Sequence, residues 1–200
     1  MRTEACTTDT VTWILSKREL NAFLGVASKD LARGNLSQIA FDAKGGAVVA
    51  TDGHRLTVAT TTAPKTDCED VRTISREDAA AAAKLASMTD EIRLTFADKT
   101  VTVAVRDRFE ALKTSISFDS KGAYTFPPYL QVISEPTRST EPLQAIGLNP
   151  AYMKAIVEIG AATGGNAVRL SVFGELEPVH FAATGEDDSE WLHVIMPMRI

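Results

Sequence analysis

The chain has 200 residues, of which 44% are hydrophobic and 24% charged, and this is the composition of an ordinary soluble globular protein. A formal net charge of −5 argues against binding nucleic acid through overall charge, so any contact with DNA must come from a local basic surface. No apolar run approaches the roughly 18 residues of a membrane helix. The polar start MRTEACTTDT lacks the apolar region of a secretory signal, so we expect a cytoplasmic protein with a flexible N-terminus at residues 1–10. Cys6 and Cys68 lack the spacing of a zinc site, and we expect neither a metal nor a cofactor.

A pattern of one short strand, an amphipathic helix and two or three further strands recurs three times. In the first copy, VTWIL at residues 11–15 is rich in β-branched and aromatic residues and predicts a strand. Ser16 is the expected N-cap of the helix, and Glu19 completes a capping box. The helix is expected to end near Arg33. Its apolar face is formed by Leu20, Phe23, Leu24 and Ala27.

Strands at residues 36–43 and 47–63 complete the first copy, and the turn sequence KGG separates them. The second copy begins with VRTI, followed by Ser75 as the N-cap of an alanine-rich helix. The alternating sequence EIRLTFADKTVTVAVRD then predicts a hairpin, and FEALKTSISF predicts a further strand.

The third copy begins with LQAIGL and has Asn149 as N-cap and Pro150 in the first helical position. Its predicted strands are AVRLSVFG, PVHFAATG and WLHVIMPMRI. Ahead of it, residues 126–142 hold four of the eight prolines, and we expect an extended connector between domains there. Three such copies predict an α+β architecture with antiparallel sheet on one side and helices on the other.

The stretch VVATDGHRLTVAT at residues 48–60 places Asp-Gly-His-Arg within an otherwise apolar strand. Asp52 and His54 could form an acid–base pair, but no nucleophile or third ligand completes a catalytic or metal site. His180 and His193 lie on other predicted strands, without ligand spacing. We therefore do not expect an enzyme. A turn capped by polar side chains is the simplest alternative interpretation of this stretch.

Together with FPPYLQVI in the connector and VIMPMRI at the C-terminal end, this stretch resembles the bacterial DNA polymerase III β subunit, the sliding clamp. In that family an ATDGHRLA-type strand, an FPDYRRV-type link and an MPMRL-type end are hallmarks. The resemblance implies the DNA-clamp fold, built from three βαβββ half-domain repeats with antiparallel sheets outside and helices on one face. Residues 11–128 resemble a complete middle domain of two halves, residues 129–142 a connector, and residues 143–200 the second half of the last domain.

The resemblance also implies a pocket that binds short linear peptide motifs of DNA polymerases and repair proteins. Carried over position by position, its walls are Leu36, Thr51, Gly53, His54, Arg55, Leu56, Pro127, Val132, Val194, Met196, Pro197 and Met198. The residue types suit this role, because the methionines and Leu56 form an adaptable apolar floor and Gly53 permits close approach of the backbone. His54 and Arg55 would supply polar contacts at the rim. The chain departs from the family pattern at Pro128, Leu130, Gln131 and Pro178, which implies a different partner preference.

Helices of the clamp family face double-stranded DNA, and the first helix is the favoured contact here. The candidate cations are Lys17, Arg18, Lys29, Arg33, Lys84 and Lys154. Acidic neighbours leave only a small local excess of positive charge, so a solvated helix face is the competing interpretation. Two hypotheses remain open. The chain is a shortened sliding-clamp-like processivity factor, or it is a clamp mimic or adaptor that competes for clamp partners without encircling DNA.

The first domain of the family and the first half of its last domain have no counterpart in this sequence. In the family, these two pieces form the interface that closes the ring. A single half-domain exposes an apolar helix flank and a sheet edge. We therefore expect a homo-oligomer in which two chains pair through residues 143–200 about a two-fold axis, and we rank a ring of four chains below that dimer.

Overall fold

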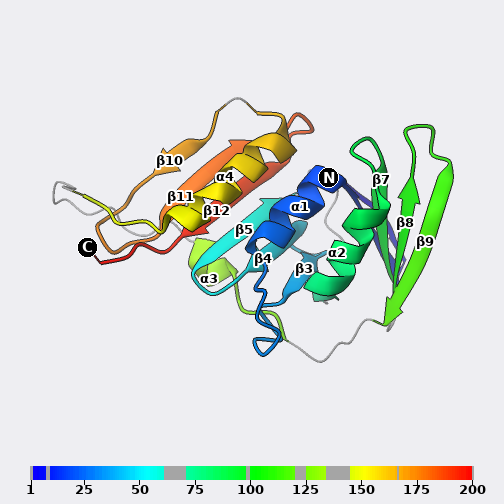
Figure 1. Cartoon of the computed structure of the whole chain (residues 1–200), viewed down its shortest axis with the longest axis horizontal. Helices are drawn as coiled ribbons and strands as arrows, with labels where there is room; N and C mark the ends of the chain where they lie inside the picture. The colour runs from blue at the N-terminus through cyan, green and yellow to red at the C-terminus, as the bar shows by residue number, and fades with distance from the viewer. Residues whose placement is uncertain are drawn as a thin grey trace.

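Two antiparallel sheets with helices along one side form the framework of this computed structural model (Figure 1). The structure describes residues 2–7, 10–60, 71–97, 100–119, 125–133, 145–165 and 167–199. The five-stranded sheet has the order β1-β2-β7-β8-β9. Its strands are β1 (Arg2–Thr7), β2 (Thr10–Ser16), β7 (Glu91–Ala97), β8 (Thr100–Arg106) and β9 (Leu112–Asp119).

The seven-stranded sheet has the order β10-β11-β12-β5-β4-β3-β6 and combines strands from all three copies. Its strands are β10 (Arg169–Ser171), β11 (Val179–Thr184), β12 (Glu190–Ile195), β5 (Arg55–Thr60), β4 (Ala47–Thr51), β3 (Gln38–Asp42) and β6 (Val71–Ser75). Antiparallel pairing of β12 with β5, with Val194 opposite Leu56, joins the third copy to the first. The sheet is therefore continuous across the junction between the two copies.

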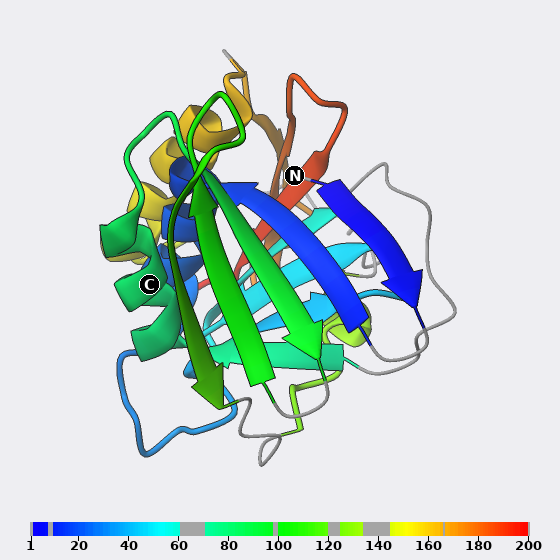
Figure 2. The ribbon, with the colours of Figure 1, turned by 90° about the vertical axis from the view of Figure 1, so that its right-hand side faces the viewer.

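Three helices lie side by side on one side of the sheets: α4 (Pro150–Thr163), α1 (Lys17–Val26) and α2 (Arg76–Leu85) (Figure 1). Figure 2, turned by 90°, shows the five-stranded sheet in front of the strands of the other sheet, with these helices along one edge. Buried apolar side chains from both sheets and all three helices form one main core. Within it, Phe23 of α1 stacks on Trp191 of β12 with ring centroids 5.1 Å apart, which fixes the first copy against the third.

The first two copies exchange their opening strands. Strand β2 opens the first copy and pairs with β7 of the second, while β6 opens the second copy and pairs with β3 of the first. The opening segment of the third copy behaves differently. Its described part, residues 145–148, forms only an isolated bridge between Gly147 and Met198. A complete βαβββ pattern is thus present in the first two copies, whereas the described part of the third begins at its helix.

The helix starts follow the sequence prediction. Ser16 Oγ accepts a hydrogen bond from Glu19 N at 3.2 Å, and Glu19 Oε2 accepts one from Ser16 N at 2.6 Å, which completes the capping box. Ser75 caps α2 and Asn149 caps α4, with Pro150 in the first turn. None of the helices in the described ranges combines the length and the apolar character that a transmembrane helix requires.

Three local expectations were wrong. Helix α1 ends at Val26 rather than near Arg33, because Ser28 and Asp30 side chains accept backbone N–H groups and so compete with helical bonding. The predicted strand at residues 47–63 is two strands, β4 and β5, because a turn separates them. The connector is not wholly extended, since α3 (Leu130–Ile133) forms one helical turn after Pro127, Pro128 and Tyr129.

The N-terminal segment also differs from the expected flexible start. Residues Arg2–Thr7 form strand β1, which pairs with β2 and places Arg2 opposite Ile14. The threonine content of this segment is compatible with a strand once a sheet edge is present. The predicted turn at Asp98-Lys99, the residues 134–144 of the connector, and Cys68 lie outside the described residues.

Candidate functional site

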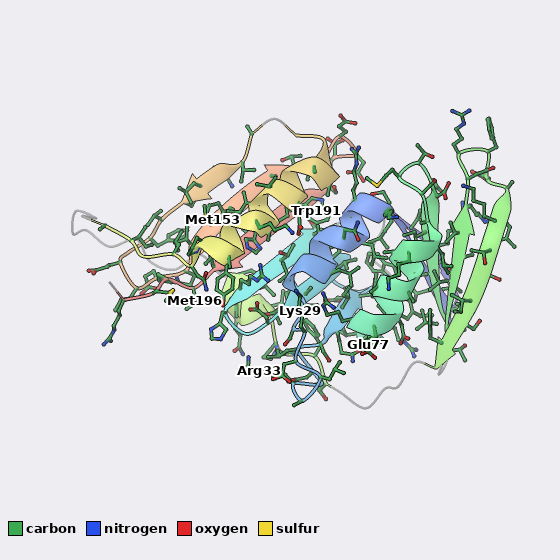
Figure 3. The ribbon with its side chains drawn as sticks, in the orientation of Figure 1. Lys29, Arg33, Glu77, Met153, Trp191 and Met196 are labelled. Carbon is green, nitrogen blue, oxygen red and sulfur yellow. The ribbon has the colours of Figure 1, made fainter. Side chains whose placement is uncertain are left out.

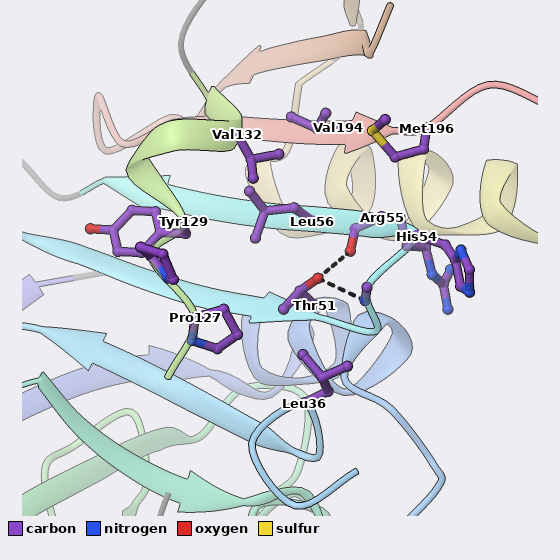
Figure 4. A pocket seen from close by; sticks show the side chains of 12 residues that line it. Leu36, Thr51, His54, Arg55, Leu56, Pro127, Tyr129, Val132, Val194 and Met196 are labelled. Carbon is purple, nitrogen blue, oxygen red and sulfur yellow. Dashed lines mark hydrogen bonds between the residues drawn. The ribbon is translucent and has the colours of Figure 1, made fainter. Parts of the chain in front are cut away.

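A pocket of about 260 Å³ lies on the face of the seven-stranded sheet opposite the helices, at the junction of β5 and β12 (Figure 4). It is lined by Leu36, Thr51, Gly53, His54, Arg55, Leu56, Pro127, Pro128, Tyr129, Val132, Val194 and Met196. These residues come from four places: the loop before β3, the β4–β5 turn and β5, the segment 125–133, and the end of β12. Segments far apart in sequence therefore meet at one site.

The floor of the pocket follows from the period of two in a β-strand. Leu56 and Val194 are opposite each other in the β5–β12 register and point to the same face, where both are buried at the bottom of the pocket. Their neighbours Thr57 and His193 point to the helix side and are fully buried. Met196, 40% exposed, follows β12 and adds a flexible apolar side chain at the rim.

The TDGHR stretch is a hydrogen-bonded turn between β4 and β5. Thr51 Oγ1 donates to Arg55 O at 2.7 Å and accepts from Gly53 N at 3.1 Å (Figure 4). Asp52 Oδ1 accepts from His54 N and Arg55 N at 2.9 and 3.1 Å. Gly53 has a φ of +90°, which other residues rarely adopt, and a Cβ there would lie 3.4 Å from Leu36 Cδ1. The alternative interpretation of this stretch, a turn capped by polar side chains, is therefore correct for the local structure. The same turn also forms one wall of the pocket.

The Arg55 side chain ties this turn to two helices. Its Nε donates to Asp52 Oδ2 at 2.9 Å, its guanidinium donates to Gly25 O of α1 at 2.7 Å, and it lies 4.8 Å from the ring centroid of Tyr152 in α4. Only 14% of the side chain is exposed. We expected Arg55 to supply a polar contact at the rim, but its guanidinium is used inside the protein. His54 is exposed at the rim, as expected.

Tyr129 is a wall residue that sequence reasoning missed. It is 7% exposed, and its hydroxyl donates to Asp42 Oδ2 at 2.6 Å, which fixes the segment 125–133 against β3. Burial, followed by the bond to Asp42, raises the pKa of the Tyr129 hydroxyl. The signal was present in FPPYLQVI, where an aromatic residue directly follows two prolines. Pro128, a departure from the family pattern, also lines the pocket.

Ten of the twelve sequence-predicted residues line this one pocket, and Pro197 and Met198 do not. The chain turns away after Met196, because Met198 N donates to Gly147 O at 2.8 Å in the bridge to the third copy. Met198 is 53% exposed outside the pocket.

The six candidate DNA contacts do not form one uniform surface. Arg18 on α1 and Lys84 near the end of α2 are exposed. Lys17 Nζ donates to Ala86 O at 2.7 Å, and Lys154 pairs with Glu158 at 3.4 Å. Lys17 and Lys154 are thus both engaged with their own protein.

The other two cations lie in the loop after α1, not on the helix, because α1 ends early (Figure 3). Lys29 and Arg33 border a polar hollow of about 360 Å³ beside the TDGHR turn. Arg33 donates to Asp52 O at 3.1 Å, and its Nε lies 3.9 Å from Asp30 Oδ2. Acidic and basic side chains therefore lie next to each other around this hollow.

One buried histidine lies directly behind the pocket. His193 Nδ1 lies 2.7 Å from Thr57 Oγ1, and burial, with a further contribution from Arg55, lowers the pKa of His193 to about 4. His193 is thus neutral at pH 7. Among the described side chains there is no group of three His, Cys, Asp or Glu residues placed to hold a metal ion.

The two antiparallel sheets, the helices on one side and the pocket between copies define a protein with the DNA-clamp fold. Its fold is similar to that of solved bacterial sliding clamps. A Eubacterium rectale protein proposed to be a DNA polymerase III beta subunit has a TM-score of 0.70 and 10% identity, over 98% of this chain and 67% of its own. The C. crescentus beta sliding clamp has a TM-score of 0.66 and 16% identity, over 98% and 68%. The Pseudomonas aeruginosa beta subunit has a TM-score of 0.64 and 17% identity, over 99% and 69%.

This chain spans about two thirds of the length of these clamp chains. No protein-family model and no curated protein matches it. The resemblance to the sliding clamp that the three sequence motifs indicate is thus confirmed at the level of the fold.

Proposed function

We propose that this chain is a sliding-clamp-like protein whose pocket binds short peptide motifs of DNA replication or repair proteins, such as a DNA polymerase. The observation that carries this proposal is the convergence of an apolar floor, Leu56 and Val194, with walls from the TDGHR turn and the segment 125–133. The C. crescentus clamp, of similar fold, was solved with polyethylene glycol bound to a region proposed to be its beta-motif tethering region.

The size of the pocket sets the kind of peptide. About 260 Å³ is below the usual range for sites that enclose a whole small molecule, so the pocket suits one or two apolar anchor side chains of a longer extended peptide. Pro128 in the wall and the exposed Leu130 beside it make this end of the pocket uncharged. We propose that partner motifs therefore place an apolar side chain there.

The pocket acts by binding rather than by catalysis in this proposal. The Asp52 carboxylate already accepts three hydrogen bonds within its own turn, from two backbone N–H groups and from Arg55. It is thus not positioned as a base for the exposed His54. A cytoplasmic location, where replication proteins are found in bacteria, belongs to the same proposal.

Peptide titration with matched methionine variants tests the proposal. A fluorescently labelled peptide carrying a clamp-binding motif is titrated into the wild type, Met196→Ala and Met198→Ala, with binding followed by anisotropy. We expect Met196→Ala to weaken binding about tenfold, because it removes an anchor contact, and Met198→Ala to leave binding unchanged. Equal effects of the two substitutions, or no binding by the wild type, would contradict the proposal.

Contact with double-stranded DNA is the less supported part of the proposal. Arg18 and Lys84 are exposed on the helix side, and Lys29 and Arg33 lie at its edge. If the chain acts as a processivity factor, it should be retained on circular duplex and lost from linear duplex, with a shallow salt dependence set by few phosphate contacts. Peptide binding without such retention would favour the adaptor that competes for clamp partners.

A further inference from the structure

The described residues of the third copy do not show the strand exchange that completes the other two. In the first two copies, the first strand after each helix, β3 or β7, pairs with the opening strand of the other copy. Strand β10 holds the same position in the third copy. Within the described residues it pairs with β11 and has no neighbour on its other edge. The opening segment 145–148 likewise makes only the Gly147–Met198 bridge.

The helix of the third copy has a matching uncovered flank. Helix α1 packs between α2 and α4, with Glu158 of α4 next to Gly25 of α1. On the opposite flank of α4, Met153, which is labelled in Figure 3, is 39% exposed. Val157, one helical turn further along α4, is 73% exposed. A Cβ added at Gly160 would meet no described atom within 4 Å. Leu170 of β10, 56% exposed, extends the apolar area to the open sheet edge. These four residues are called the α4 flank below.

The α4 flank is compatible with a two-fold axis. Its residues carry no charge, so bringing two such surfaces together places no like charges against each other. Lys154, next to it, is already paired with Glu158. Among the described residues, each third copy also has both of the parts that the other needs: an opening segment that makes only the Gly147–Met198 bridge, and a β10 edge without a neighbour. A second copy of this chain therefore satisfies both at once.

We propose that two molecules of this protein form a dimer through their third copies of the repeat. The opening segment of each third copy pairs along β10 of the other, and the two α4 flanks are in contact. The arrangement reproduces, between two chains, the strand exchange that joins the first and second copies within one chain. The pockets lie on the opposite face of the sheet at the β5–β12 junction, and they stay open in the dimer. The association is thus independent of peptide binding.

Mass measurements on three proteins test this proposal. Light scattering and sedimentation equilibrium at 1–50 μM are applied to the wild type, Val157→Asp and Leu112→Asp. The last substitution is the matched control, because Leu112 is 57% exposed on β9, the edge strand of the other sheet. We expect a wild-type mass twice the chain mass of 21.5 kDa. Val157→Asp should raise the dimer dissociation constant by about 100-fold, and Leu112→Asp should leave it unchanged.

A cross-link locates the contact. In a Cys6→Ser/Cys68→Ser background, Val157→Cys should give covalent dimers with a short bismaleimide, and Leu112→Cys should not. Circular dichroism and peptide titration verify that each variant is folded. A monomeric wild type at 50 μM, or a dimer that Leu112→Asp breaks and Val157→Asp does not, would overturn the proposal.

Discussion

The two faces of strand β12 carry different chemistry, and the contrast separates the parts of the functional proposal. On the outer face, Val194 lies in an open apolar pocket whose walls are held by short hydrogen bonds. On the helix face, Trp191 and His193 are sealed in the core, and the cations on the helices above are few and partly engaged. The outer face thus has an open apolar pocket, where we propose that a peptide binds, whereas the helix side has only scattered positive charges that could contact DNA.

The largest expected effect is a loss of stability at low pH, caused by His193 on the helix face of β12. The pKa of His193 is lowered from 6.5 to about 4 in the folded protein, so the folded state disfavours the charged form. The free energy of unfolding is therefore at its full value above pH 6.5. It falls by about 3 kcal/mol in total as the pH drops from 6.5 toward 4. Urea unfolding at pH 7.5, 5.5 and 4.5 should show this decline. His193→Gln should remove most of the slope, and a slope that persists in it would show that His193 is not the cause.

The next effect compares two acidic residues that both pair with arginine. Asp52→Ala should lower the free energy of unfolding by about 2 kcal/mol, because it removes a mostly buried partner of Arg55 and two backbone bonds. Asp30→Ala should lower it by only about 0.5–1 kcal/mol, because Asp30 is exposed, lies 3.9 Å from Arg33, and accepts one exposed backbone bond, from Ala32 N. Denaturant titration of both variants measures the difference. Similar losses of stability in the two variants would contradict the conclusion that the hydrogen bonds of Asp52 hold the TDGHR turn.

A third pair compares two glycines. Gly53→Ala should cost about 1.5 kcal/mol, because its φ of +90° is unfavourable for alanine, and it should weaken peptide binding through the displaced turn. Gly160→Ala should instead stabilise the chain by about 0.5–1 kcal/mol, because it lies within α4 with room for a Cβ. Thermal unfolding should show a lower Tm for Gly53→Ala and a higher Tm for Gly160→Ala than for the wild type. A neutral Gly53→Ala would show that the turn tolerates other backbone geometry.

The smallest effect tests how the outer wall is held. Tyr129→Phe removes the hydroxyl that donates to Asp42 and should cost about 1 kcal/mol of stability. Peptide affinity should fall only a few-fold, because the ring still fills the wall. Asp42→Ala should lower peptide affinity by a similar amount, and the double variant Tyr129→Phe/Asp42→Ala should show no further loss of peptide affinity. Additive losses would mean that the two residues act separately.

Most of the framework follows from local rules that the sequence obeys. The N-caps Ser16, Ser75 and Asn149 and the alternation along β7 and β8 predict the elements directly. The end of α1 could not be predicted from apolar spacing, because the side-chain bonds of Ser28 and Asp30 decide it. The role of Arg55 was missed for a similar reason. Its partners Gly25 and Tyr152 lie on two helices, and only the folded chain brings them to the turn.

The pocket was largely accessible from sequence because its residues lie in three recognisable motifs. Tyr129 was missed because its position depends on the bond to Asp42, a long-range contact. Pro128 was named from sequence only as a departure from the family pattern, and it lines the pocket. Pro197 and Met198 were wrongly expected to line it, since the Gly147–Met198 bridge redirects the end of the chain.

The most direct test of the central claim is a map of where the peptide binds. Backbone amide NMR shifts are recorded while an unlabelled peptide with a clamp-binding motif is added to the chain. We expect the largest changes at Gly53, Leu56, Val194 and Met196, with none at Val157 or Leu170 on the α4 flank. Changes confined to the α4 flank, or spread evenly over the surface, would contradict the assignment of the pocket.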